Sequence, residues 1–433
     1  MTYLYLYYIM LFKVGNMFFR VHSGEMSMDF NAALKLLEKY NQTQLLDYYA
    51  ELDEKKRREL LSAIESIDFA TFSKVDFHTE RKVGRLSPAD ALSLDEVNAR
   101  RDEFESAGLA AIKSGKVAAV LLAGGQGSRL GHDAPKGTFN IGVTKKLTIF
   151  ELQMRALINV AIKAGRYPQL FIMTSALNDR ETRAFFRENN YFGYDEKMVH
   201  FYVQKTAPAF SFDGKILLAE KHKPVLTPNG NGGWYSSLTE AECGKILESE
   251  GIEWLNVYGV DNVLQRVCDP VFIGATILSG LACSSKVVKK TGAAEKVGVL
   301  CKENGLPSVV EYYEMPDENK TEKDDKGELV YRYGVTLNYI FNVEKLNGVK
   351  ANGLPYHLAA KRISCLKDGK LCEPDEPNGY KLETLAVDIV KLMGSCLGVE
   401  VERDKEFAPV KNKTGVDSVD TARALLIKNG FEI

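Results

Sequence analysis

Runs of apolar residues alternate with amphipathic segments in the middle of the chain. Residues 117–122 and 170–174 are apolar without alternation, a pattern typical of strands that are covered on both faces. Residues 150–164 and 179–189 carry apolar side chains at helical spacing, and each of these segments borders a predicted strand. The order strand, helix, strand, helix predicts an α/β fold with a central, doubly wound, Rossmann-like mixed sheet, whose ligands bind beyond the carboxyl ends of the strands.

The segments on either side of this pattern predict two further regions. Leucine and isoleucine recur at helical spacing among charged residues near the start, so we expect an N-terminal helical region over 28–100. We assign 101–360 to the central domain and 361–433 to a small C-terminal segment. That segment contains an amphipathic stretch over 382–397, which predicts a helix.

Residues 1–27 differ from the rest of the chain. They begin with an aromatic and apolar run that has no basic leader and is much shorter than the roughly 20 residues that a membrane helix needs. A signal-anchor is one interpretation. The interpretation that we favour is a translation start at Met26 or Met28, which makes 1–27 a non-native or disordered extension and predicts no membrane partner.

Composition narrows the class of protein. The formal net charge is −2 over 433 residues, so the basic surface that nucleic-acid binding requires is not expected. The seven cysteines are scattered and never form a C-x-x-C pair, which indicates reduced thiols rather than disulfides or a zinc site. We therefore expect a cytoplasmic protein with small-molecule partners.

A glycine-rich loop follows the first predicted strand. Residues 122–131 read Leu-Ala-Gly-Gly-Gln-Gly-Ser-Arg-Leu-Gly, and Pro-Lys-Gly follows at 135–137. Glycines at such a position let backbone N–H groups approach anionic oxygens, and Arg129 and Lys136 add positive charge. A dinucleotide fingerprint would need a small residue in place of Leu130, and a P-loop would end in Gly-Lys-Ser/Thr. The loop predicts a polyphosphate site; the alternative is a tight strand-to-helix turn.

Further along the chain, the motifs around this loop resemble one known family. The blocks that carry the resemblance are 122–131, 135–137, 171–175, 204–217, 228–233, 257–262, 295–299, 309–312 and 406–412. Together they resemble the eukaryotic-type UDP-sugar pyrophosphorylases, and most of all the UDP-N-acetylhexosamine branch. The resemblance implies transfer of a uridylyl group from UTP to a sugar 1-phosphate, with Mg²⁺ as cofactor and pyrophosphate as the second product.

The resemblance also implies roles for individual residues. It implies catalytic cations at Arg129, Lys136 and Lys411. It implies a nucleotide site at Ala123, Gly124, Gly125, Gly127, Gln204 and Gly230. It implies sugar contacts from Asn231, Gly298 and Glu311. The metal ligand is Asp261, which directly follows a third predicted strand over 254–260; Mg²⁺ held by one carboxylate and by phosphates is a common arrangement. The alternative for Asp261 is an Asx turn with Asn262.

Two positions depart from the branch pattern. Val335 stands where the branch carries a sugar-contacting asparagine, and Tyr339 where it carries a histidine. The preferred sugar therefore has alternatives. We expect N-acetylglucosamine 1-phosphate, against glucose or galactose 1-phosphate or a broad-specificity enzyme, and a non-catalytic UDP-sugar-binding protein is a third reading. The chain ends soon after Lys411, so we expect a monomer or weak oligomer without an extra β-rich domain.

Overall fold

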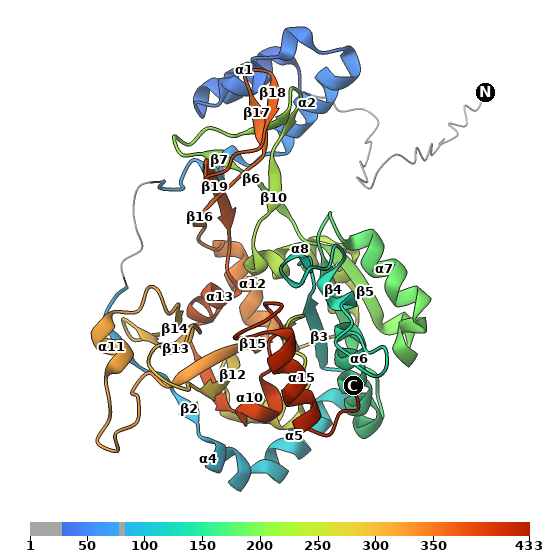
Figure 1. Ribbon diagram of the computed structural model, residues 1–433, viewed down its shortest axis with the longest axis vertical. Coiled ribbons are helices and arrows are strands. Elements are labelled where there is room, and N and C mark those ends of the chain that lie inside the picture. The colour runs from blue at the N-terminus through green and yellow to red at the C-terminus, as the bar shows by residue number, and fades with distance from the viewer. Residues whose placement is uncertain (1–27, 78–82) are drawn as a thin grey trace, which may run out of the picture.

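The computed structural model describes residues 28–77 and 83–433 (Figure 1). Residues 1–27, for which we expect a non-native extension, lie outside the described residues. A large mixed sheet forms the centre of the molecule. The strand order is β2 (Ala91–Leu92), β20 (Cys396–Glu400), β12 (Cys283–Lys289), β15 (Tyr333–Asn342), β11 (Trp254–Gly259), β3 (Val117–Leu122), β4 (Gln169–Thr174) and β5 (Val199–Val203).

Strands β11, β3, β4 and β5 run parallel, as the sequence predicts for buried apolar runs. Strand β15 is antiparallel to both of its neighbours, β11 and β12, which makes the sheet mixed. An antiparallel branch extends from the start of β15. It consists of β13 (Val299–Glu303), β14 (Leu306–Val310) and β1 (Leu86–Pro88).

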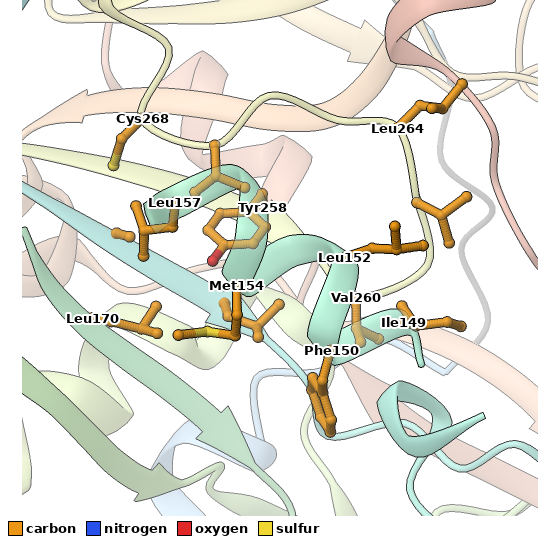
Figure 2. Packing of buried hydrophobic residues seen from close by; sticks show 14 of the residues in the cluster. Ile149, Phe150, Leu152, Met154, Leu157, Leu170, Tyr258, Val260, Leu264 and Cys268 are labelled. Carbon is orange, nitrogen blue, oxygen red and sulfur yellow. The ribbon is translucent and has the colours of Figure 1, made fainter. Parts of the chain in front are cut away.

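Helices cover both faces of the sheet. All six residues of β3 are buried, and they alternate between two apolar clusters: Val117, Ala119 and Leu121 face one, and Ala118, Val120 and Leu122 the other. The first cluster is closed by α5 (Arg101–Lys113), α6 (Ile149–Ala164), α7 (Asp179–Glu188), α10 (Pro270–Ser279) and α15 (Val419–Lys428). Figure 2 shows residues of α6 packed in this cluster with Leu170, Tyr258 and Val260. The second is closed by α8 (Trp234–Glu240), α9 (Glu242–Ser249), α12 (Val343–Asn352) and α13 (Ala386–Leu392).

Helices α5 and α10 approach each other closely. A Cβ on Gly108 would lie 1.9 Å from the carbonyl oxygen of Pro270, and a Cβ on Gly274 would lie 1.8 Å from that of Phe104. These two glycines allow backbone-to-backbone contact between the helices, which no larger residue permits.

A second, smaller lobe lies at one end of the molecule (Figure 1). Its core combines three helices from the N-terminal region with residues from two distant stretches of the chain, among them Phe210, Leu218 and Leu382. The helices are α1 (Phe30–Lys39), α2 (Glu54–Ser66) and α3 (Phe69–Phe72). The strands are β6 (Thr206–Pro208), β7 (Phe210–Ser211), β8 (Leu218–Glu220), β9 (Lys223–Pro224), β10 (Leu226–Pro228), β16 (His357–Lys361), β17 (Cys365–Lys367), β18 (Lys370–Cys372) and β19 (Gly379–Glu383).

The structure corrects one predicted helix. Residues 382–397 do not form a continuous helix, because Leu382 belongs to β19, which pairs with β16 and β7. Only the middle of the stretch is helical, as α13, and β20 begins at Cys396. Within the part of the chain that the structure describes, every helix is too short or too polar to cross a membrane.

Candidate active site

A cleft of about 520 Å³ lies at the carboxyl ends of β3, β4 and β11. This is the edge of the sheet at which ligands of doubly wound folds bind. Its walls contain most of the residues that the sequence singles out. These are Gly124, Gly125, Arg129, Lys136, Gln204, Gly230, Asn231, Asp261 and Lys411.

The glycine-rich loop forms one wall of the cleft. The loop is closed on itself by two backbone hydrogen bonds, from Gly127 N to Ala134 O (3.0 Å) and from Lys136 N to Gly125 O (3.2 Å). Among the described residues, none accepts a hydrogen bond from the backbone N–H of Gly124 or of Gly125. These two amides can therefore donate to an anionic ligand without breaking the loop.

The loop residues Ala123 and Gly127 have other surroundings. Ala123 N donates to Met173 O at 2.8 Å, and Ala123 O accepts from the side chain of Asn178 at 2.9 Å. The Gly127 amide is occupied by Ala134, and a Cβ at Gly127 would lie 2.8 Å from the ring of His132. Neither residue lines the cleft; through these contacts, both support the conformation of the loop.

Lys136 interacts with three other charged groups in the cleft. Its side chain is 9% exposed, and burial lowers the pKa of the ammonium group from 10.5. Attraction to Asp261 acts against burial and raises this pKa, whereas repulsion from Arg129 and Lys411 lowers it further. Three cations thus line the cleft together with two carboxylates, those of Asp261 and Glu383. The net positive charge suits a ligand with several negative charges.

Asp261 lies in a rigid turn directly after β11. Its backbone oxygen accepts from Val410 N at 2.8 Å. Two buried glutamines hold the preceding carbonyls: Gln153 Nε2 donates to Val260 O (3.1 Å) and Gln265 Nε2 to Gly259 O (2.6 Å). The turn presents one carboxylate to the cleft, beside the cationic loop.

The donors in the cleft fit a Mg²⁺ that takes only one ligand from the protein. No group of three His, Cys, Asp or Glu side chains suited to a metal occurs among the residues that the structure describes. Mg²⁺ commonly binds through one or two carboxylates and completes its shell with substrate phosphates and water. Asp261 would supply the carboxylate oxygen for this arrangement.

The opposite wall is formed where the small lobe joins the sheet. Gln204 follows β5 directly, and its Nε2 donates to Gly230 O. Its Oε1 points toward Gly124, where a Cβ would lie only 2.9 Å away. Gly230 has φ +85°, and a Cβ there would lie 2.2 Å from Thr384 O. Both positions therefore require glycine, because the space that a side chain would take is filled by Gln204 and by the backbone of Thr384.

The side chain of Asn231 already makes one hydrogen bond within the protein. Its Oδ1 accepts from Ala386 N at 2.9 Å, at the start of α13. The side chain still lines the cleft, so its amide nitrogen is the group that faces a ligand's acceptor.

Gly298 and Glu311 lie next to each other, outside the cleft lining. A Cβ on Gly298 would lie 3.3 Å from Glu311 Oε1 and 3.5 Å from Val335 Cγ2. Val335 precedes the cleft residue Leu337 by two positions on β15. Tyr339, in contrast, is fully buried against Phe341 and belongs to the apolar core.

Some cleft residues carry no signal in the sequence. Glu383 and Leu385 line the cleft, and they come from the end of β19 and the segment that follows it. Leu337 has φ +53°, and its side chain lies 2.6 Å from the position of a Cβ on Gly259. Backbone bonds from Thr384 N to Asn229 O (2.7 Å) and from Gly232 N to Thr384 O (2.9 Å) bring Glu383 to this place, and a local pattern does not reveal them.

Comparisons with known proteins agree with this geometry. The profile of the family described as UTP–glucose-1-phosphate uridylyltransferase matches residues 72–428. A human protein, UDP-N-acetylhexosamine pyrophosphorylase-like protein 1, is 36% identical over 81% of this chain and 70% of its own length. The UDP-N-acetylglucosamine pyrophosphorylase of Saccharomyces cerevisiae is 35% identical over 90% of this chain and 88% of its own length.

A solved structure is similar over nearly the whole chain. The crystal structure of the uridine diphosphate N-acetylglucosamine pyrophosphorylase from Trypanosoma brucei, in complex with an inhibitor, superposes with a TM-score of 0.78. It is 28% identical and covers 94% of this chain and 86% of that chain. The family resemblance and the α/β fold expected from the sequence are thereby confirmed. The chain belongs to the UTP–glucose-1-phosphate uridylyltransferase family.

Proposed function

We propose that the protein transfers the uridylyl group of UTP to N-acetylglucosamine 1-phosphate, with Mg²⁺, and releases pyrophosphate. The observation that carries this proposal is a single cleft that is lined by Arg129, Lys136, Lys411 and Asp261, beside a loop with open amides. Similarity to UDP-N-acetylglucosamine pyrophosphorylases over 90% of the chain supports the choice of substrates.

The reaction requires positioning and charge neutralisation more than side-chain chemistry. An oxygen of the sugar phosphate attacks the α-phosphorus of UTP, and the bond between this phosphorus and the leaving pyrophosphate breaks. Both reactants are anions, so catalysis comes from holding them in line and stabilising the charge that develops on the leaving group. No residue of the chain needs to form a covalent intermediate.

Each wall of the cleft has a part in this proposal. Arg129, Lys136 and the amides of Gly124 and Gly125 hold the triphosphate, while Lys411 neutralises the sugar phosphate. Asp261 would hold Mg²⁺, which supplies positive charge to the phosphate oxygens when bound. Gln204 and Gly230 line the cleft side by side; since the Gln204 amide nitrogen donates to the Gly230 carbonyl, its Oε1 is the acceptor that suits the N–H of a uracil.

Val335 bears on the choice of sugar. Val335 places an apolar Cγ2 where it faces Gly298 and the Glu311 carboxylate. An apolar wall lacks the amide that would select an acetamido group, which favours a second candidate, a glucose or galactose 1-phosphate enzyme of broad specificity. We propose that Glu311 and Asn231 contact sugar hydroxyls in both cases.

A panel of acceptors separates the candidates. Pyrophosphate release is measured with UTP, Mg²⁺ and the 1-phosphates of N-acetylglucosamine, N-acetylgalactosamine, glucose and galactose. The proposal predicts the highest kcat/KM with N-acetylglucosamine 1-phosphate. Equal values for acetylated and non-acetylated sugars would establish the second candidate. UTP binding without any turnover, by a protein whose Lys411→Ala variant behaves identically, would establish a non-catalytic binding protein.

The cellular setting follows from the same proposal. All seven cysteines are free thiols in the structure, and six of them are buried, which supports a cytoplasmic location. Because the cleft is built by one chain alone, we also propose that a monomer or weak oligomer suffices for activity.

A further inference from the structure

We propose that Asn262 is a positioning residue for the transfer reaction: it holds segment 406–410 on the sheet edge, so that Lys411 lies opposite Asp261. This inference rests on the proposed role of Lys411 in binding the sugar phosphate. Asn262 is the neighbour of the metal-binding candidate, and its side chain turns away from the cleft into the protein, where it is 2% exposed.

The side-chain amide of Asn262 bonds the backbone of the segment in two places. Its Nδ2 donates to Glu406 O at 2.7 Å, and its Oδ1 accepts from Ala408 N at 2.9 Å. Two backbone hydrogen bonds flank this pair, from Val263 N to Ala408 O (3.2 Å) and from Val410 N to Asp261 O (2.8 Å). The side-chain amide of Asn262 thus takes the place of a backbone peptide group in the pairing of two segments that lie far apart in the chain.

Other contacts hold the two ends of segment 406–410. At its start, Glu406 forms an ion pair with the buried Lys286, at 2.5 Å. After the segment, Lys411 N donates to Asp417 O and Lys411 Nζ lies 3.0 Å from Asp417 Oδ2, but the connecting residues 412–416 are exposed. The turn is bonded to the start of α15, from Val419 N to Asn412 O (3.0 Å). Between these two ends, the hydrogen bonds to Asn262 and to the Asp261 carbonyl hold the segment on the sheet edge, together with the packing of Ala408 and Val410 in the first apolar cluster.

Asparagine is the side chain that this position requires. The amide offers one donor and one acceptor in a plane, which matches the carbonyl and the N–H of alternate residues on an adjacent strand. Aspartate would lose the donor and would place a buried charge beside Asp261; alanine would lose both bonds to the segment and also the bond that Oδ1 accepts from Leu264 N (3.3 Å). A displacement of about 1 Å in a phosphate-binding group can lower a rate by about 10²-fold.

A double-mutant cycle tests whether Asn262 acts through Lys411. We expect Asn262→Ala to lower kcat/KM for pyrophosphate release by about 10- to 100-fold, with UTP binding in the presence of Mg²⁺ unchanged by calorimetry. In the Lys411→Ala background the same substitution should have almost no further effect, because the group that it positions is absent. Losses that multiply in the double variant would overturn the inference.

Asn256→Ala is the matched control. Asn256 lies on β11, the strand that precedes Asn262, and is 1% exposed; it donates to Asn338 Oδ1 (2.7 Å) and Tyr339 O (2.9 Å) and accepts from Cys268 N (2.7 Å). Asn256→Ala loses a comparable set of buried hydrogen bonds, none of which, among the described residues, reaches segment 406–410. Any loss of activity in Asn256→Ala should multiply with that of Lys411→Ala, as expected for independent sites.

Hydrogen exchange gives a readout that does not depend on activity. In Asn262→Ala, or in Asn262→Ser if the alanine variant does not fold, the amides of Ala408 and Val410 should exchange faster than in the parent protein and in Asn256→Ala. Unchanged exchange in this segment would refute the positioning role, whatever the enzyme's activity. If exchange rises but Lys411→Ala remains fully active, the proposed role of Lys411 in the reaction is the part that fails.

Discussion

Replacing Lys136 with methionine should separate catalysis from stability. The side chain is 9% exposed, and burial lowers the pKa of its ammonium group, so the folded protein holds this charge at a cost. Methionine has a similar length and no charge. We therefore expect Lys136→Met to lose activity while the ligand-free protein keeps or increases its stability, as is typical of residues kept for function.

The two effects have different sizes and different pH dependences. Loss of one preorganised donor to a developing charge costs about 10²–10³ in kcat, or about 2.7–4 kcal/mol. For stability, the pKa of Lys136 is lower in the folded state than its unfolded value of 10.5, so the unfolded state binds more protons between the two values. The stability of the parent protein therefore rises with pH across this window. The advantage of Lys136→Met should be largest at neutral pH and should vanish above pH 10.5.

The assay combines pyrophosphate release with thermal unfolding of the ligand-free protein at several pH values between 7 and 10. Arg129→Met serves as the comparison, because Arg129 lines the same cleft but is exposed, so its removal should reduce activity without the stability gain. A clear loss of Tm at pH 7 in Lys136→Met would refute the account of its burial. Activity within about threefold of the parent would refute its place beside the transferred phosphate.

Three further predictions concern other parts of the structure. Asp261→Asn should abolish the dependence of the rate on Mg²⁺ concentration over the range that saturates the parent, because the carboxylate ligand is lost; a normal Mg²⁺ titration curve would exclude Asp261 as the ligand. Gly230→Ala should raise the KM for UTP, because its Cβ would lie 2.2 Å from Thr384 O. Gly305→Ala is the control for the effect of a positive φ alone: Gly305 has φ +83°, nothing lies within 4 Å of its Cβ, and KM should not change. Gly108→Ala should lower the free energy of unfolding by about 1–3 kcal/mol in a urea titration, through overpacking at a contact of 1.9 Å, with both KM values unaffected; unchanged stability would contradict the close approach of α5 and α10.

The sequence is informative wherever a pattern is local and continuous. The runs that became β3 and β4 are apolar on both faces, and that pattern alone predicts strands covered by helices on each side. The glycine-rich loop was recognisable because glycine and cationic residues follow a buried strand directly. The structure then brings Arg129, Lys136 and Asp261 into one cleft, as the expected phosphate site requires.

Other features depend on contacts that a local pattern does not contain. Strand β19 was mistaken for part of a helix, because the apolar spacing around Leu382 fits a helix, whereas its pairing with β7 and β16 decides the conformation. The small lobe was not visible as a unit for the same reason, since its core joins three separate stretches of chain. The amide of Gly127 could not be assigned from composition, because its bond to Ala134 depends on how the loop closes.

A crystal structure of the protein with UDP-N-acetylglucosamine and Mg²⁺ tests the central claim most directly. The account predicts the uracil at Gln204 and Gly230, the diphosphate between Arg129, Lys136 and Lys411, and the hexose directed toward Glu311. Density for the nucleotide in another cavity, such as that of about 330 Å³ lined by Arg101 and Arg266, would contradict it.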